Sequence, residues 1–327
     1  MFRRKRKRTV SLEMDDFAIR ALVDTTGDLS MATVHEVVLK PGVIVDEEVK
    51  DELALFDTLK TFVKEWNISK SDVRFFTPDH SVMMRAFTHP DDVATEELKA
   101  YVEMEIGQTI HLPFDDPLID VYDHVPDDGE AVLFAAPSDE IYKAMQLFED
   151  VGLHPTILDV RTLSNIRFLK HTSFFKESRT YLLIDWSIHA AALSIYTDGN
   201  VEFLRYQPTE NPSRSWRYSM DKGYTYEEDI EEYRQTLINH LFEIERILNF
   251  YRFSLNKGEE SVDDIVMMGD NPEMTFIVEQ LKTVIDLPVH VIDDVYVQRD
   301  FPQFEAKHAA LIGLALRGRH PNNGTRH

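Results

Sequence analysis

The sequence predicts an α/β protein with two similarly folded halves, the first of which carries an inserted subdomain. Three observations predict this fold class. A chain of 327 residues is long for a single ordinary domain. A strand–acid–turn–strand pattern occurs twice, about half a chain apart, and the segment between the two copies has the element order β-α-β-β-α-β. With 43% hydrophobic and 28% charged residues, the composition is that of a globular protein.

The repeated pattern is a three-stranded meander with an acidic residue after its first strand. The first copy predicts strands over Thr9–Leu12, Phe17–Val23 and Val34–Leu39. The second copy predicts strands over Tyr181–Ile184, Ala190–Tyr196 and Val201–Tyr206. Glu13 and Asp185 are the acids at the matching positions. Meanders are common enough to repeat by chance, whereas a duplication gives two similar domains that face one another.

A self-contained block of elements separates the two copies, after a helix over 47–66 and a strand at Val73–Phe76. Its predicted strands and helices are Val82–Phe87, Glu96–Ile110, Leu118–Val125, Ala131–Ala136, a helix N-capped by Ser138 that runs to Val151, and Thr156–Val160. The predicted domains are a basic tip at 1–8, a first domain at 9–80 and 156–178, the inserted βαββαβ subdomain at 81–155, a second domain at 179–316 and a disordered tail at 317–327.

The second domain continues with an irregular stretch over 211–225 and then a long helix over about 227–255. Apolar and aromatic residues in that helix are spaced by threes and fours, so one of its faces should be buried. The remaining predicted elements are a strand at Ile265–Met268, a helix ending at Ile285, a strand at Val289–Ile292 and a closing helix at Glu305–Leu316.

The charge is strongly acidic, with 35 Lys and Arg residues against 58 Asp and Glu residues and a net charge of -23. An acidic body repels phosphates, which disfavours nucleic acid as a partner. Six bases gather at Arg3, Arg4, Lys5, Arg6, Lys7 and Arg8. This tip either contacts an anionic membrane or is a solvated, disordered start. Comparing the binding of the intact and tip-deleted protein to anionic liposomes tests the first alternative.

The sequence has no cysteine, no apolar stretch near the roughly 20 residues of a spanning helix, and no secretory signal at its start. We therefore expect a cytoplasmic protein, held at the inner face of the membrane by its tip or by a partner.

Catalytic motifs are missing as well. The sequence contains no Walker A loop, dinucleotide-binding glycine turn, nucleophile elbow or paired-histidine zinc helix. It therefore predicts no catalytic residue and no metal site. One constellation is left: Glu13 and Asp185 at matching strand ends, together with the strand-to-glycine turn that ends at Gly269. Two acidic turns and one glycine turn from duplicated halves are the layout of an actin-type nucleotide cleft.

The order of further segments resembles the PilM family, actin-like and FtsA-related proteins of type IV pilus assembly. The segments that carry the resemblance are Arg85–Phe87, Tyr101–Ile106, Ile110–Phe114, Val132–Pro137, Glu149–Pro155, Leu158–Val160, Glu243–Arg252 and His308–Ala315. Each motif alone is weak evidence for the family. Together, in this order, the motifs extend the resemblance over about residues 9–316. The resemblance implies a ribonuclease H-like duplicated fold. It also implies that a groove between the first domain and the inserted subdomain receives the cytoplasmic tail of PilN, a bitopic membrane protein.

Three loops depart from the pattern that the resemblance leads us to expect. Asp15 stands where the first phosphate loop should have glycine, Trp186 and Ser187 follow Asp185, and Asp270 and Asn271 follow Gly269. Side chains at glycine positions hinder the approach of phosphate to the backbone, and added carboxylates repel it. We therefore expect Glu13, Asp185, Ser187 and Gly269 to form a degenerate nucleotide cleft, with ATP and magnesium bound weakly or not at all.

The expected function is a cytoplasmic scaffold that docks a PilN-like tail and catalyses no reaction. It could also associate with itself or with other assembly components. The alternatives are a working actin-fold ATPase or nucleotide-gated switch, an FtsA-like cell-division filament protein, and an acidic adaptor of another system. Pilus extension, DNA uptake and secretion are not separated by the residues.

Overall fold

The computed structural model describes residues 8–126, 128–209 and 215–319. Of the basic tip, Arg8 is described, so the expected membrane contact of Arg3–Arg8 lies mostly outside these residues. Within the described parts, no helix is long and apolar enough to cross a membrane.

Two five-stranded sheets form the body, and they share one topology. The first has the order β10-β6-β1-β2-β3, with β1 Thr9–Met14, β2 Ala18–Asp24, β3 Thr33–Val38, β6 Asp72–Phe76 and β10 His154–Asp159. The second has the order β13-β12-β11-β16-β17, with β11 Thr180–Trp186, β12 Ala190–Thr197, β13 Asn200–Pro208, β16 Asp264–Met268 and β17 Val289–Val291. In each sheet, three antiparallel strands form a meander. Two further strands, parallel to the first strand of the meander, extend the sheet on that strand's other side. The repeated pattern thus corresponds to a repeated sheet, and β1 is equivalent to β11.

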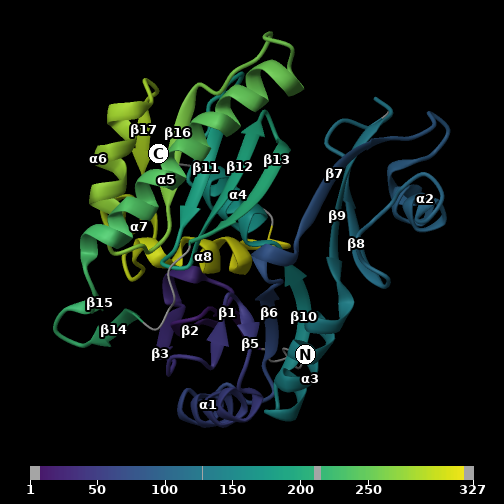
Figure 1. Cartoon of the computed structure of the whole chain (residues 1–327). Coiled ribbons are helices and arrows are strands. Elements are labelled where there is room, and N and C mark those ends of the chain that lie inside the picture. The colour runs from purple at the N-terminus through teal and green to yellow at the C-terminus, as the bar shows by residue number, and fades with distance from the viewer. Residues whose placement is uncertain (1–7, 127, 210–214, 320–327) are drawn as a thin grey trace, which may run out of the picture.

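The inserted subdomain is a small sheet with the order β7-β9-β8, from β7 Met83–Thr88, β8 Pro117–Tyr122 and β9 Glu130–Pro137. Helix α2, Leu98–Glu105, covers one of its faces through Val102, which packs on Leu133 and Ile110. The subdomain stands to one side of the two sheets (Figure 1).

The last two elements of the predicted β-α-β-β-α-β block keep their order but pack on the first domain. Helix α3, Ser138–Asp150, lays Phe148 against Phe75 of β6, and β10 pairs with β6. Helix α3 and β10 therefore contribute to the core of the first sheet. Ser138 is the first residue of α3, whose N-cap is Pro137, and its hydroxyl donates to the Asp116 carboxylate at 2.8 Å.

The other helices and small elements differ from their predicted limits mainly at the ends. The predicted helix over 47–66 starts later, because the hairpin β4 Ile44–Val45 and β5 Glu48–Val49 precede α1 Glu52–Glu65. The long helix is α5 Ile230–Asn249, continued by the π-helical η5 Phe250–Leu255. The unpredicted elements are α4 Arg161–His171, α7 Asp294–Asp300 and the hairpin of β14 Trp216–Ser219 with β15 Gly223–Tyr226. The remaining helices are α6 Met274–Val284, α8 Ala309–Leu316, and the short η1 Leu29–Met31, η2 Asp79–Ser81, η3 Thr95–Glu97 and η6 Ala306–His308.

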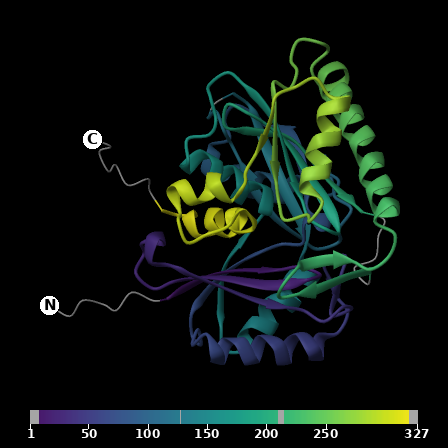
Figure 2. The ribbon, with the colours of Figure 1, turned by 90° about the vertical axis from the view of Figure 1, so that its left-hand side faces the viewer.

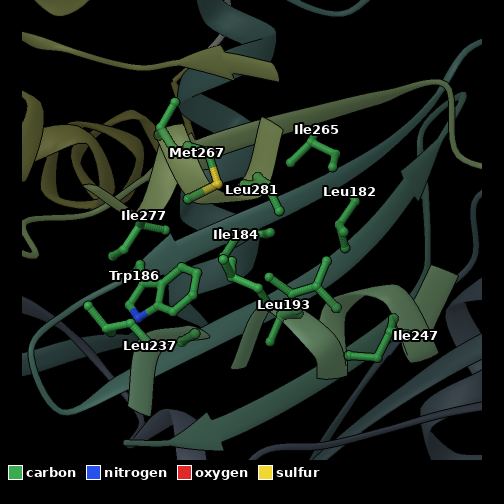
Figure 3. Packing of buried hydrophobic residues seen from close by; sticks show 14 of the residues in the cluster. Leu182, Ile184, Trp186, Leu193, Leu237, Ile247, Ile265, Met267, Ile277 and Leu281 are labelled. Atoms are coloured by element: carbon green, nitrogen blue, oxygen red, sulfur yellow. The ribbon is translucent and has the colours of Figure 1, made fainter. Parts of the chain in front are cut away.

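The outer faces of the two sheets are covered by different helices. Helices α1 and α3 cover the first sheet, with Leu55 and Phe148 in its core. Helices α5 and α6 cover the second, where Ile184 and Trp186 pack with Leu237 and neighbouring side chains (Figure 3).

Helices α4 and α8 join the two domains, and α8 lies between the sheets (Figures 1 and 2). Gly313 of α8 touches α4 so closely that an added Cβ would lie 1.9 Å from the Ser164 carbonyl oxygen. Arg167 of α4 donates to the Gly313 carbonyl at 2.9 Å. This packing fixes the start of α4, which carries Arg161, between the two domains.

The described start of the predicted disordered tail is held by ion pairs. Arg317 lies 3.0 Å from Asp159, and Arg319 pairs with Asp24. The rest of that tail, 320–327, is outside the described residues.

Candidate functional site

The two acids predicted at matching strand ends meet between the domains. Glu13 and Asp185 are the next-to-last residues of β1 and β11, and both side chains are buried. Arg161, the first residue of α4, bridges them: one terminal nitrogen pairs with Glu13, and Nε donates to Asp185 at 2.7 Å. Asn165, one turn further along α4, also donates to Asp185 at 2.7 Å. The predicted acids thus hold a guanidinium that the sequence analysis did not single out.

A second arginine, Arg20, joins the loop after β1, which contains Asp15, to the loop after β16, which contains Asp270. Arg20 of β2 is 1% exposed and lies opposite Glu13 in the sheet register. Its guanidinium lies 3.2 Å from Asp15, 3.0 Å from Glu36 and 2.7 Å from Asp270. Burial raises the pKa of Asp270, but the Arg20 charge outweighs burial and holds the pKa below its usual range. The pairing of Arg20 with several carboxylates also went unpredicted, because its partners are scattered along the chain.

The first loop uses its own backbone donors. Asp15, at the expected glycine position, accepts from the amides of Phe17 and Ala18, each at 2.7 Å. A glycine-rich loop would offer such amides to a phosphate. Burial also raises the pKa of Asp15, although Arg20 partly offsets this effect.

The second and third loops are fastened to each other. The Ser187 hydroxyl accepts from the Ala190 amide at 3.2 Å and closes the β11–β12 turn. Gly269 has φ +104°, and a Cβ there would lie 2.3 Å from the Trp186 carbonyl oxygen. Asn271 donates to the Ser187 carbonyl at 2.7 Å. Gly269 is thus needed where β16 passes closely against β11.

One cavity of about 420 Å³ opens at the end of the first sheet, and we call it the acidic cavity. Glu13, Asp185 and Ser187 line it, whereas Gly269 does not. Its wall comes from the ends of β1 and β6, the β4–β5 hairpin, α3 and the β11–β12 turn. Nine of its lining residues are acidic, against the two bases Lys143 and Arg161 and one histidine, His189. Three of the four predicted site positions therefore converge on a cavity that carries excess negative charge.

A buried histidine–carboxylate pair extends the polar lining. His189 of the β11–β12 turn lies 3.6 Å from Glu47, whose other oxygen lies 3.3 Å from His80. Burial lowers the pKa of His189, but the contact with Glu47 outweighs it and raises the pKa to about 9. Burial likewise raises the pKa of Glu47, and its bonds from His189 and His80 hold it below the usual range. No motif links these residues, which are far apart in the sequence.

The turn that presents Glu47 is itself unusual. Asp46 and Glu47 both have positive φ, 53° and 63°, which side-chain-bearing residues rarely adopt. The Asp16 carboxylate holds this conformation by accepting from both amides, at 2.8 and 2.9 Å. Residues kept in such regions often occur at functional sites.

Metal-ligand geometry occurs at the rim. Among the described residues, Glu48, His80 and Glu140 offer ligand atoms that all lie within 4.8 Å of one another. Exposed acidic groups commonly gather in this way without an ion, and Glu48 already pairs with Lys50. We assign no metal to this group.

The sequence was compared with models of known protein families. A family model described as type IV pilus assembly protein PilM matches residues 14–211, more than half of the chain. The chain belongs to the PilM family. This match confirms the predicted resemblance and, with the duplicated sheets, the predicted actin-like fold.

Three solved structures can be compared with this chain at the level of the fold. A PilM–PilN type IV pilus biogenesis complex is similar over 96% of this chain and 99% of that chain, with 17% identity and a TM-score of 0.72. A protein with an actin-like ATPase fold from Bacteroides thetaiotaomicron covers 96% and 98%, with 9% identity and a TM-score of 0.49. The ethanolamine utilization protein EutJ from Carboxydothermus hydrogenoformans covers 96% and 90%, with 8% identity and a TM-score of 0.49. We draw no separate conclusion from the latter two. No curated protein matches the sequence significantly.

We expect Arg161→Ala to lower the free energy of unfolding by about 3–5 kcal/mol, because it leaves two carboxylates buried without their shared counter-charge. Urea denaturation measures this difference. The matched control is Arg246→Ala, whose side chain is 75% exposed and pairs with Glu243 within one helix. That variant should lose less than about 1 kcal/mol. Equal losses for the two variants would contradict a structural role for the Arg161 bridge.

The His189–Glu47 pair predicts a pH dependence. Since the folded-state pKa of His189 is about 9, above its ordinary 6.5, its stabilisation is complete below pH 6.5 and is lost as pH rises through 9. The stability difference between the natural protein and His189→Asn should therefore shrink by about 3 kcal/mol from pH 6 to pH 10. Denaturant titrations across this range measure it. A His154→Asn variant, changed at an exposed position, should show a flat difference; a flat difference for His189→Asn would refute the pairing.

Proposed function

We propose that this PilM-family chain is a cytoplasmic actin-like scaffold that docks the tail of a PilN-like membrane protein and does not use ATP. The proposal rests on the polar groups of the cleft, which are already paired with one another. Its acids are bridged by arginines, and its first-loop amides are already bonded by Asp15. A structurally similar chain occurs in a PilM–PilN complex, which supports the choice of partner.

Charge and geometry both oppose a triphosphate in the cleft. Glu13, Asp15 and Asp270 gather around Arg20, so that a bound nucleotide would add negative charge to an acidic cluster. The guanidinium groups of Arg20 and Arg161 are engaged with carboxylates rather than pointing into open space. Binding a phosphate there would require these buried pairs to be broken, at a cost of several kcal/mol.

Calorimetric titration with ATP, with and without magnesium, is expected to give no binding heat. The same titration of Asp185→Ala should be equally silent, because no nucleotide is present to lose a contact. Micromolar affinity that Asp185→Ala abolishes would contradict the proposal and would favour a nucleotide-gated switch. The unfolding midpoint of each sample, measured alongside, shows that a silent titration comes from folded protein.

A second cavity, of about 600 Å³, lies between the inserted subdomain and α4, and we propose it as the groove that takes the tail. One wall is the face of β8 and β9 opposite α2, including Leu118 and Phe134, and the other is α4 with Leu163. The Tyr122 hydroxyl donates to the Gly199 carbonyl at 3.1 Å, so that the groove also reaches the second domain. We call this cavity the docking groove. An apolar groove beside strands suits an extended peptide.

A synthetic peptide of the cytoplasmic tail of the PilN-like protein should bind the full chain with micromolar affinity or better. Asp120→Trp should weaken this binding at least tenfold, since Asp120 is exposed in the docking groove and the indole would fill it. Asp92→Trp is the matched control, because Asp92 is exposed in the same subdomain and lines neither cavity. Calorimetry measures both. Equal affinities for the two variants would place the tail elsewhere.

A further inference from the structure

We propose that the acidic cavity binds a guanidinium or ammonium group at the end of an apolar stem, presented by an arginine or lysine in an extended partner segment. The cleft would thereby take a cation where an actin-type fold takes a triphosphate. This inference does not depend on which segment occupies the docking groove.

The first support is charge that the chain itself leaves unbalanced. Arg161 neutralises Glu13 and Asp185 in part, and His189 pairs with Glu47. Arg20 pairs with Asp15, and Lys50 pairs with Glu48. Among the described residues, the lining acids Glu52, Asp79 and Asp150 form no ion pair. A cavity with this surplus attracts a cation and repels an anion.

The second support is one buried acceptor without a donor and one partly buried carboxylate without a partner. Glu13 is 2% exposed, yet its Oε2 atom is buried without a hydrogen-bond partner in the described structure. Within the same described residues, the Asp79 carboxylate makes no hydrogen bond or ion pair, although it lines the cavity at the start of η2. Burial and the neighbouring Glu47 raise the pKa of Asp79. Buried acceptors normally have donors, and a guanidinium brings several in one plane.

The third support is the shape and the apolar part of the wall. Ile141, Ala144 and Leu147 of α3 line one side, with Val49 and Tyr206 at other points. A hydrated metal ion gains nothing from such a wall, whereas the methylene stem of arginine or lysine packs against it. A volume of about 420 Å³ exceeds the needs of one bare ion and accommodates a side chain with its neighbours.

The chain already contains one guanidinium bound in this way. Arg161 places a guanidinium between two carboxylates at the base of this cavity, and its planar group lies 5.9 Å from the centre of the Phe76 ring. A ligand guanidinium near Asp79 would meet the same combination of carboxylate and apolar surface. Arginine suits this environment because its planar fork can bond two carboxylate oxygens at once.

The test uses the full chain and three probes in calorimetry: capped Leu-Arg-Leu, the same peptide with neutral citrulline for arginine, and agmatine as a free small cation. The arginine peptide should bind at least tenfold more tightly than the citrulline peptide and than agmatine. Asp79→Asn should weaken the arginine peptide about tenfold and leave the citrulline peptide unchanged. Asp79 makes no internal bond in the described structure, so this variant should fold normally.

Asp139→Asn is the control, since Asp139 is exposed on α3 and does not line the cavity. It should change the affinity less than twofold, which separates local recognition from general attraction to an acidic protein.

Equal binding of the arginine and citrulline peptides would overturn the charge recognition. Agmatine binding as tightly as the arginine peptide would overturn the partner segment in favour of a free polyamine. Failure of all three probes at millimolar concentration would overturn the site itself, while leaving the tail-binding result intact.

Discussion

The two domains are held in register by the guanidinium of Arg161, which pairs with Glu13 of the first sheet and Asp185 of the second. Both carboxylates lie at the ends of equivalent strands, where the duplicated fold brings the domains face to face. Neither could remain charged and buried alone, because an unpaired buried carboxylate costs several kcal/mol. Burial raises the pKa of Glu13, and the charges of Arg161 and Arg20 offset only part of this rise. The positions of the two strands, the start of α4 and the width of the cleft therefore depend on one another.

The placement of Arg161 depends in turn on how α4 packs. A base at the first position of a helix meets the positive end of the helix dipole, which is unfavourable. The carboxylates of Glu13 and Asp185 offset this repulsion, and Asn165 of the next turn shares Asp185 with Arg161. The close approach of α4 to α8, which only glycine at 313 permits, keeps the helix start aimed at the cleft. A distant helix contact thus sets the geometry of the polar centre.

The sequence predicts the parts of this arrangement that have a local signature. The alternation of the meanders identifies both sheets, and the acid after the first strand identifies Glu13 and Asp185. Helix α4 escapes prediction because Arg161-Thr162-Leu163-Ser164-Asn165 carries little apolar periodicity, and its burial comes from α8 and the second sheet. The partners of Arg20 escape for a related reason, since Asp270 lies 250 residues away in the chain. Gly269 carries a requirement that its local sequence does not reveal, since a Cβ there would meet the Trp186 backbone of the neighbouring strand.

The charge of the cleft is a consequence of these pairings rather than of the acidic composition alone. Acids on an exposed surface are screened by water and ions, and they exert little effect beyond about 10 Å. In the cleft, Asp15, Glu13 and Asp270 are buried around Arg20. Screening is weak there, so each added anion is repelled by the carboxylates. Replacing Asp15 with glycine would free the amides of Phe17 and Ala18, but it would also remove one carboxylate from Arg20 while leaving the others in place. The negative charge of the cleft is therefore distributed over three loops and shared by two arginines, and no single residue accounts for it.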